Sequence, residues 1–292
     1  MNLKCRLHLP DSLDADSVST EPKIKYHLPI LSSPDFGLFR APGPGLGNLL
    51  FPIARAVVGS ETFGGRVVIP TMRQIKVGTY LRRERDKRTY DKIFRPRTRS
   101  EWIDWAYARN RKSQDEANHN ASLSVIRYKG MGRQFHDLAG HADIVSKFLL
   151  SVSRCAPQTD QYDIAMHVRL GDFAAANVTE AKQNTRLTFE WYGEALEAAR
   201  EHLGKKTPRG VLFTDEDPSL LIENLRLQNF APEPPGNALT TLFAMSRAKI
   251  LIASRSTFSL WGQYLGNSLA IWPNGFNLEQ YKSVDPNYDL FV

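Results

Sequence analysis

The apolar residues of this chain fall into short uninterrupted runs separated by stretches with helical spacing. Between the runs, apolar residues three or four apart predict helices, one beginning at Asn48 as cap with Pro52 near its first turn, another capped by Thr188. Strands that alternate with helices are typical of parallel α/β domains. The predicted strands lie at 36–40, 66–70, 163–169, 210–214, 249–253 and 269–272.

The predicted elements divide the chain into three parts. Residues 1–30 are rich in Asp, Ser and Pro without periodicity, so we expect a loose arm there. The 292 residues are enough for two ordinary domains. A polar, Pro-containing stretch at 155–160 predicts the boundary between an N-terminal α/β domain, 31–157, and a C-terminal α/β domain, 158–292. Residues 113–122 are polar and predict a loop.

The composition excludes several classes of protein. Hydrophobic residues make up 42% and charged residues 24%, which excludes wholesale disorder. No stretch approaches the ~18 apolar residues of a membrane span, and the first 30 residues lack the apolar core of a secretory signal. The two cysteines, Cys5 and Cys155, exclude a disulfide scaffold and a zinc site of their own. We therefore expect a cytoplasmic protein.

Positive charge is concentrated in one block. Between Arg73 and Lys112 there are 14 Lys or Arg and five Asp or Glu, whereas the whole chain has a net charge of +7. Such a block is typical of binding to nucleic acid, to an anionic membrane surface or to an anionic small ligand, or simply of a solvated surface. Trp102, Trp105 and Tyr107 add stacking residues to the nucleic-acid alternative. No nucleic-acid motif accompanies them, so no nucleic-acid partner is expected.

Polar clusters follow three of the predicted strands, at 169–172, 214–215 and 254–257. Ligands of open α/β sheets bind beyond the carboxyl ends of the strands, and a helix N-terminus attracts phosphate. Arg169 adds a forked, permanently charged donor that suits a diphosphate. These clusters predict a nucleoside-diphosphate ligand.

Each cluster also has a purely structural explanation. His167 fits a buried core histidine, and Arg169 fits an ion pair with Asp172 across the turn. Ser256 and Thr257 fit a helix cap.

The acidic segment Asp215-Glu216-Asp217 has two possible interpretations, a metal site and a helix start. An Asp-x-Asp pair after a strand holds Mn²⁺ or Mg²⁺ in metal-dependent glycosyltransferases, since hard oxygen ligands suit these ions. The same acids fit the first turn of a helix that starts at Pro218. We favour the helix start, because Arg169 already supplies a cation for the diphosphate.

Taken together, three blocks resemble the α-1,2-fucosyltransferases that use GDP-fucose, in that family's order. Residues 45–51 (GLGNLLF) are similar to its GLGNQLF, 167–172 (HVRLGD) to its HxRRGD, and 254–261 (SRSTFSLW) to its SNSTFSWW. The departures are Leu49 for Gln, Leu170 for the second Arg, Arg255 for Asn and Leu260 for Trp.

The resemblance implies a GT-B-like fold, with two Rossmann-like domains facing across a cleft. It implies metal-independent, inverting transfer of fucose from GDP-fucose to a glycan hydroxyl, in an α-1,2 linkage to galactose. The C-terminal domain would hold the GDP-sugar and the N-terminal domain a glycan or lipid-linked oligosaccharide acceptor. No metal or other cofactor is expected. The basic block is expected to contact the acceptor or the inner membrane face.

The resemblance also assigns roles to residues. Arg169 and the helix that begins after Ser256 would stabilise the departing diphosphate, and Asp215 would accept from ribose or guanine. Asp172 is the candidate general base, with Glu180 behind it. Three functions remain as alternatives: a metal-dependent transferase using Asp215 and Asp217, a non-catalytic nucleotide-sugar binder, and a nucleic-acid binder. The expected catalytic residues are His167, Arg169 and Asp172, and the expected donor-binding residues are Gly47, Asn48, Thr214, Asp215, Ser256, Thr257 and Phe258.

Overall fold

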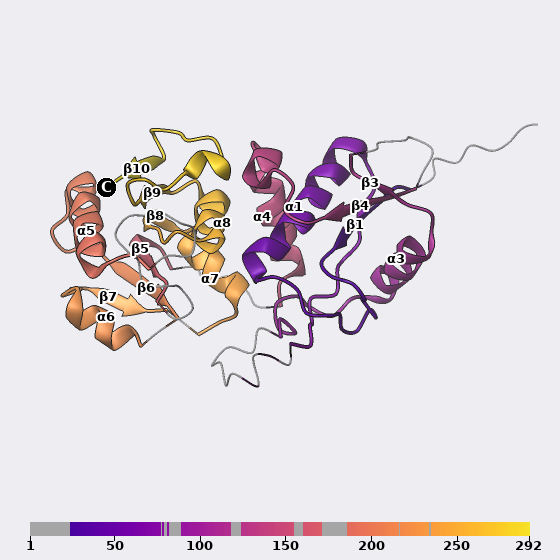
Figure 1. Cartoon of the computed structure of the whole chain (residues 1–292), viewed down its shortest axis with the longest axis horizontal. Coiled ribbons are helices and arrows are strands. Elements are labelled where there is room, and N and C mark those ends of the chain that lie inside the picture. Colours follow the sequence, from indigo (N-terminus) through magenta and orange to yellow (C-terminus); the bar gives the residue numbers. More distant parts are fainter. Residues whose placement is uncertain are drawn as a thin grey trace, which may run out of the picture.

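The computed structural model describes residues 24–76, 78, 81, 89–117, 124–154, 160–170, 186–215, 217–233 and 235–292. The described strands form two sheets, and every pair of neighbouring strands is parallel. The two sheets lie side by side with helices between them (Figure 1). This confirms the expected α/β class with two parallel-sheet halves, as in a GT-B-like fold.

The N-terminal sheet is built around a strand that the sequence did not predict. Its strands are β1 (Tyr26–Ile30), β2 (Arg66–Val67), β3 (Gln114–Asp115) and β4 (Val125–Lys129), in the order β2-β1-β4-β3. The loose arm predicted for residues 1–30 is therefore wrong at its end. Strand β1 contains the polar residue His27, so the sequence pattern does not indicate a buried strand. In the fold, the His27 ring is buried and forms hydrogen bonds with the Tyr128 hydroxyl at 2.8 Å and the Gly64 carbonyl at 3.0 Å.

Two further local predictions for this half are wrong. Residues 36–40 form a hairpin turn and no strand, with single bridges from Asp35 to Arg40 and from Arg40 to Gln74. The polar stretch 113–122 contains the edge strand β3, and its residues 118–122 lie outside the described residues.

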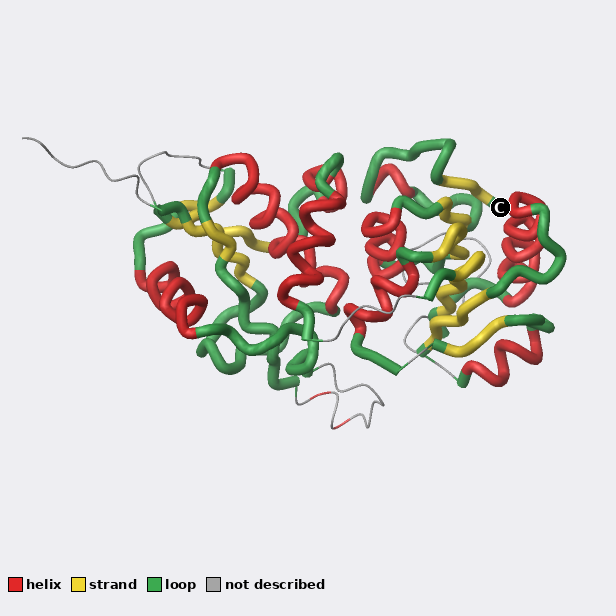
Figure 2. The backbone as a smooth tube through the Cα atoms, turned by 180° about the vertical axis from the view of Figure 1, so that it is seen from behind, coloured by secondary structure: helices red, strands yellow, loops and turns green. Residues whose placement is uncertain are grey.

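Three of the helices that the structure describes cover the N-terminal sheet: α1 (Leu46–Phe63), α3 (Arg99–Asn110) and α4 (Ala142–Val152). Helices α1 and α4 lie on the side that faces the C-terminal half, and α3 lies on the far side (Figures 1 and 2). The predicted cap at Asn48 is wrong, because α1 begins three residues earlier with Gly45 as its N-cap. No helix among the described residues is both long and apolar enough to cross a membrane.

The C-terminal sheet has six strands in the order β10-β9-β8-β5-β6-β7. The prediction of β5, β6, β8 and β9 is confirmed, whereas β7 and β10 are only three residues long and were missed. From the central β5 the chain moves outward through β6 to β7 and then returns to β8 on the other side of β5. The strands are β5 (Tyr162–Val168), β6 (Gly210–Thr214), β7 (Phe230–Pro232), β8 (Ala248–Ile252), β9 (Leu269–Trp272) and β10 (Asp289–Phe291).

Four helices accompany this sheet: α5 (Phe189–Leu203), α6 (Pro218–Asn224), α7 (Ala238–Met245) and α8 (Thr257–Gly266). The predicted cap at Thr188 is confirmed, since its hydroxyl accepts from the Trp191 amide at 3.2 Å. Two short 3₁₀ turns, Gln134–Leu138 and Leu278–Gln280, complete the described elements.

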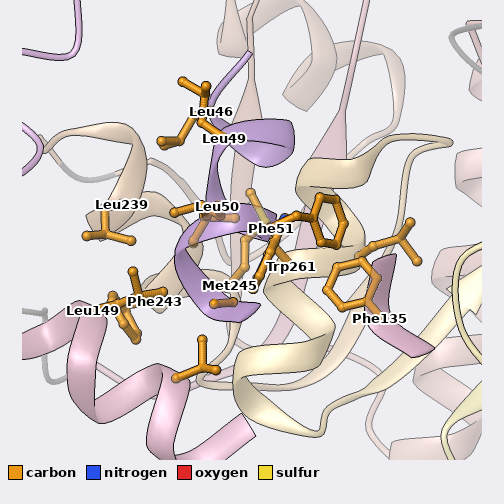
Figure 3. Close-up of a cluster of buried hydrophobic side chains, with 14 of the residues drawn as sticks. Leu46, Leu49, Leu50, Phe51, Phe135, Leu149, Leu239, Phe243, Met245 and Trp261 are labelled. Atoms are coloured by element: carbon orange, nitrogen blue, oxygen red, sulfur yellow. The ribbon is translucent and has the colours of Figure 1, made fainter. Parts of the chain in front are cut away.

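A single apolar cluster joins the two halves. Phe51 on α1 lies 5.0 Å, centroid to centroid, from Trp261 on α8, and Phe135 lies 4.9 Å from the same indole (Figure 3). All three side chains are almost fully buried. Large aromatic side chains bury more area than any other type, so this contact holds α1 against α8.

Candidate functional site

The carboxyl ends of β5, β6 and β8 bring the predicted polar clusters together. Strand β5 pairs with β6 on one side, where Val168 is opposite Thr214, and with β8 on the other, where Met166 is opposite Ile252. Arg169, Thr214-Asp215 and residues 254–257 therefore meet at one edge of the sheet. The connectivity changes direction at this point, and that is where open α/β sheets bind their ligands.

Arg169 is held by Asp215 from the neighbouring strand. Its Nε lies 3.4 Å from Asp215 Oδ2, and the Leu170 amide donates to Asp215 Oδ1 at 2.9 Å. The two side chains are 26% and 24% exposed, so both still reach solvent. Asp215 thus orients Arg169 at the sheet edge, and its expected role toward ribose or guanine stays a prediction.

His167 organises a buried cluster of hydroxyls behind this pair. Its Nδ1 lies 2.7 Å from Ser259 Oγ and 3.1 Å from Ser254 Oγ, and Ser254 Oγ lies 3.0 Å from Ser256 Oγ. Burial, and to a lesser extent Arg169, lowers the pKa of His167 to about 3, so its ring is neutral near pH 7. His167 therefore lies in the core as a buried histidine, and its direct catalytic role stays a prediction.

Ser256 caps α8, as the sequence predicted. Its Oγ accepts from the Ser259 amide at 3.2 Å, and the first turn of α8 contains no acidic residue. The Phe258 ring lies 5.5 Å from the His167 ring. The partial positive charge of this helix end therefore lies beside the Arg169 cluster.

The start of α1 packs directly on the start of α8. A Cβ placed on Gly47 would lie 2.7 Å from Thr257 Oγ1 and 3.5 Å from the Phe258 amide nitrogen. Only glycine allows this approach. Asn48 follows in the same turn, and its Oδ1 is buried without a hydrogen-bond partner in the described part of the chain. Gly47 and Asn48 thus lie where the two helix starts meet.

Arg255 is a candidate site residue that the sequence prediction did not include. It directly follows the β8 edge, is partly buried, and its Nη2 lies 3.5 Å from the Asn274 carbonyl. Burial raises the pKa of the Tyr192 hydroxyl, while Arg169 and Arg255 both oppose that rise, so both cations lie near this hydroxyl. The departure from the family's Asn at position 255 was the signal that could have identified it.

The structure also bears on the acidic alternatives. Asp217 Oδ1 accepts from the Ser219 amide at 2.9 Å and caps α6, with Pro218 in the first turn, which confirms the helix start. Among the described residues, no group of three or more His, Cys, Asp or Glu is placed to hold a metal ion. The predicted general bases Asp172 and Glu180 lie outside the described residues.

Comparison with known proteins adds distant structural likenesses. No protein-family model and no curated protein matches the chain. The crystal structure of NodZ α-1,6-fucosyltransferase soaked with GDP-fucose is 11% identical, with a TM-score of 0.38, covering 83% of this chain and 93% of that chain. POFUT1 in complex with GDP is 11% identical, with a TM-score of 0.43, covering 92% and 98%. Fucosyltransferase NodZ from Bradyrhizobium is 13% identical, with a TM-score of 0.37, covering 82% and 93%.

Proposed function

We propose that this protein transfers fucose from GDP-fucose to a hydroxyl of a glycan. One observation carries the proposal: the three sequence blocks that resemble the GDP-fucose family touch one another in the fold. Gly47 of the first block packs on Thr257 of the third, and His167 of the second binds Ser254 and Ser259 of the third. Residues far apart in the chain thus form one polar site beside a parallel sheet.

The proposed donor site holds the diphosphate between two sources of positive charge. Arg169 presents a forked cation, oriented by Asp215, and the N-terminus of α8 presents its dipole. Arg255 supplies a second cation at the same sheet edge. This charge replaces the one that Leu170 removes from the family's Arg-Arg pair. Asp215 and Thr214 then face the nucleoside side of the donor.

The proposed reaction is a single inverting displacement. The acceptor oxygen attacks the anomeric carbon of fucose from the face opposite GDP, and the bond from that carbon to the diphosphate oxygen breaks. Negative charge grows on the departing GDP, where Arg169 and the start of α8 stabilise it. The acceptor proton passes to a carboxylate, for which Asp172 and then Glu180 are the candidates. The positive charge of Arg169 and Arg255 makes a metal ion unnecessary in this proposal.

The acceptor is proposed to bind on the N-terminal side of the junction, near Asn48. Asn48 Oδ1, which is buried and has no hydrogen-bond partner among the described residues, supports this, because it can accept from a sugar hydroxyl. An α-1,2 linkage to galactose, in a glycan or a lipid-linked oligosaccharide, follows the family resemblance. Cytoplasmic polysaccharide synthesis remains the proposed setting.

A thermal-shift experiment tests the donor first. GDP, UDP, ADP, CDP and GDP-fucose are compared with and without EDTA, since a ligand that binds only the folded state raises Tm. We expect a shift with GDP and GDP-fucose that EDTA does not change. A shift with UDP that requires Mn²⁺ would instead favour the metal-dependent alternative at Asp215 and Asp217.

A transfer assay then separates catalysis from binding. Arg169→Ala is expected to lower transfer by ~10²–10³-fold, the usual cost of removing one preorganised donor. Lys206→Ala is the matched control, because Lys206 is an exposed cation of the same half. Normal transfer by a folded Arg169→Ala protein would refute the assignment. A wild type that binds GDP-fucose but transfers it to no glycan acceptor would favour the non-catalytic binder.

A further inference from the structure

The hairpin at residues 35–40 exposes apolar side chains to water. Phe36 is 59% exposed, Leu38 69% and Phe39 37%. The Phe36 amide donates to the Phe39 carbonyl at 2.9 Å, so these side chains gather on one tight turn. A contiguous group of exposed large apolar residues is uncommon on a surface that faces only water, and marks an interaction site.

This turn is held firmly in its conformation. Gly37, with a φ of 83°, donates its amide to Asp35 Oδ1 at 2.8 Å. Its carbonyl accepts from Arg97 Nη1 at 2.8 Å and from Thr71 Oγ1 at 3.1 Å. The left-handed φ requires glycine at this point. The exposure of the apolar side chains is therefore built into the fold.

A second segment extends the apolar surface. The Ile75 amide donates to the Arg40 carbonyl at 3.3 Å, and Arg40 also bridges to Gln74. Ile75 is 51% exposed and lies in the chain between Arg73 and Lys76. We call Phe36, Leu38, Phe39 and Ile75 the hairpin patch. Basic residues therefore adjoin its apolar side chains.

The acidic residues near the hairpin patch are already paired with arginines. Asp35 Oδ2 lies 3.9 Å from Arg109 Nη1, and Glu101 pairs with Arg95 at 2.7 Å. Each pair neutralises one arginine together with its carboxylate. Arg73, two residues before Ile75, is an exposed cation beside the patch.

The nearby aromatic residues are engaged inside the protein. The Arg97 guanidinium lies over Trp102 and Trp105, at 4.7 Å and 5.3 Å from the ring centroids. Both indoles also lie close enough to Gly37 that a Cβ there would meet each at 2.9 Å. The exposed groups of the hairpin patch are two phenyl and two aliphatic side chains beside the exposed Arg73, a combination that suits a lipid interface.

We propose that the hairpin patch docks the protein on an anionic lipid bilayer. The four apolar side chains enter the interfacial region, and Arg73 with its basic neighbours contacts the anionic headgroups. Helix α3, on which the hairpin rests, lies on the side of the N-terminal sheet away from the C-terminal half (Figure 1). This proposal does not depend on the transferase reaction.

Vesicle flotation of the full chain tests the proposal. Phosphatidylcholine vesicles are compared with vesicles that also contain phosphatidylglycerol, at low and high salt. We expect binding to the anionic vesicles that weakens with salt, because screening reduces the headgroup attraction. The double variant Phe36→Ser/Leu38→Ser is expected to lose about tenfold or more in vesicle affinity, since it removes most of the inserted apolar area.

Matched variants separate docking from folding and from activity. Leu220→Ser changes an equally exposed residue, 59%, on α6 and is expected to float like the wild type. The double variant should keep the Tm of the wild type, because neither side chain is buried. It should also keep its GDP-induced shift in Tm, so failure of the donor proposal would not affect this test.

Three results would overturn the membrane proposal. They are a wild type that binds no anionic vesicle, equal binding by the wild type and the double variant, and equal binding to neutral and anionic vesicles. Self-association or oligonucleotide binding that the same variant abolishes, without vesicle binding, would assign the hairpin patch to a second copy or to nucleic acid instead.

Discussion

The indole Nε1 of Trp261 donates a hydrogen bond to the carbonyl of Gly47 at 2.6 Å, across 214 positions of the chain. Both groups are buried. This bond joins the first turn of α1 to α8 beside the proposed donor site, and it adds a polar contact to the apolar packing between the two helices.

Trp261→Phe is expected to lose the hydrogen bond and to leave a small cavity where the larger indole packed. The Gly47 carbonyl lies within α1 and keeps its place in the helix, so loss of the indole bond costs about 1 kcal/mol, and the Gly47 turn is then less fixed. Urea unfolding and kcat/KM measure both effects. Trp191→Phe is the control, because its Nε1 donates to the Val292 carbonyl at 2.8 Å, away from the junction. A larger loss of kcat/KM in the control would contradict the prediction.

Gly47→Ala is expected to force α1 and α8 apart, since its Cβ would lie 2.7 Å from Thr257 Oγ1. Overpacking of this kind costs about 1–3 kcal/mol. The double variant Gly47→Ala/Thr257→Ala removes the clashing oxygen and should regain most of the Tm. Thermal unfolding of both proteins checks this, and an equally low Tm in the double variant would show that the contact with Thr257 is not the cause.

Arg255→Asn restores the family's residue at this position and is expected to lower transfer by about 10²-fold, because it removes the second cation of the donor site. Adding Leu170→Arg returns the family's Arg-Arg pair and should recover much of the activity. Initial rates with saturating acceptor measure this. If the single variant transfers at the wild-type rate, Arg255 has no part in binding the diphosphate.

The stability of the protein should decrease as the pH is lowered, because of His167. Its pKa is about 3 in the folded state and near its ordinary 6.5 when unfolded. Between these values the unfolded state binds one more proton than the folded state. The contribution is therefore complete above pH 6.5 and decreases by about 1.4 kcal/mol per pH unit as the pH falls toward 3.

Urea unfolding of the wild type and of His167→Gln measures this slope. The window from pH 5 to 6.5 is the most informative, because it lies above the ordinary pKa of 4.5 of carboxyls such as Glu101, whose stabilisation by Arg95 is lost only below that value. His167→Gln should show the smaller slope. Identical slopes for the two proteins would mean that His167 is not held neutral.

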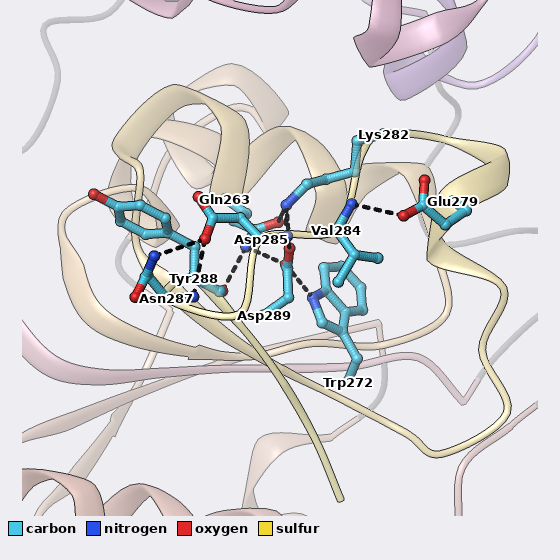
Figure 4. A network of polar contacts seen from close by, with 9 residues as sticks. All are labelled: Gln263, Trp272, Glu279, Lys282, Val284, Asp285, Asn287, Tyr288 and Asp289. Atoms are coloured by element: carbon cyan, nitrogen blue, oxygen red, sulfur yellow. Dashed lines mark hydrogen bonds and ion pairs between the residues drawn. The ribbon is translucent and has the colours of Figure 1, made fainter.

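Asp289 anchors the last strand through a buried ion pair. Its Oδ2 lies 2.7 Å from Lys282 Nζ, and its Oδ1 accepts from Gln263 Nε2 at 2.8 Å and from Trp272 Nε1 at 3.1 Å (Figure 4). The Asp285 amide also donates to Asp289 Oδ2, at 2.9 Å. Asp289→Ala removes the carboxylate to which these four groups donate, so we expect a loss of roughly 3–5 kcal/mol, or failure to fold.

Two milder variants make the Asp289 prediction testable if Asp289→Ala does not fold. Asp289→Asn should cost less than Asp289→Ala, because its amide oxygen can still accept from Gln263 Nε2 and Trp272 Nε1. Asp285→Asn is the control on the same turn. Chemical denaturation orders the three proteins, and a control as unstable as Asp289→Ala would contradict the central role of Asp289.

The sequence by itself determined most of the C-terminal sheet and the motifs at its edge. Strands β5, β6, β8 and β9 are uninterrupted apolar runs, and the caps Thr188 and Ser256 act within three residues of themselves. Such signals are local in the chain, so these elements can be predicted without knowledge of the tertiary structure. The polar residues after β5, β6 and β8 were found for the same reason.

Only the tertiary structure decided which of these residues meet. Strand β1 was missed because His27 looks polar, and it becomes buried only when Tyr128 and Gly64 supply its hydrogen bonds. Strands β7 and β10 are too short to leave a periodic signal. The contact of Gly47 with Thr257 and the pairing of Arg169 with Asp215 depend on how helices and strands pack across long separations in the chain, which no local pattern of residues records.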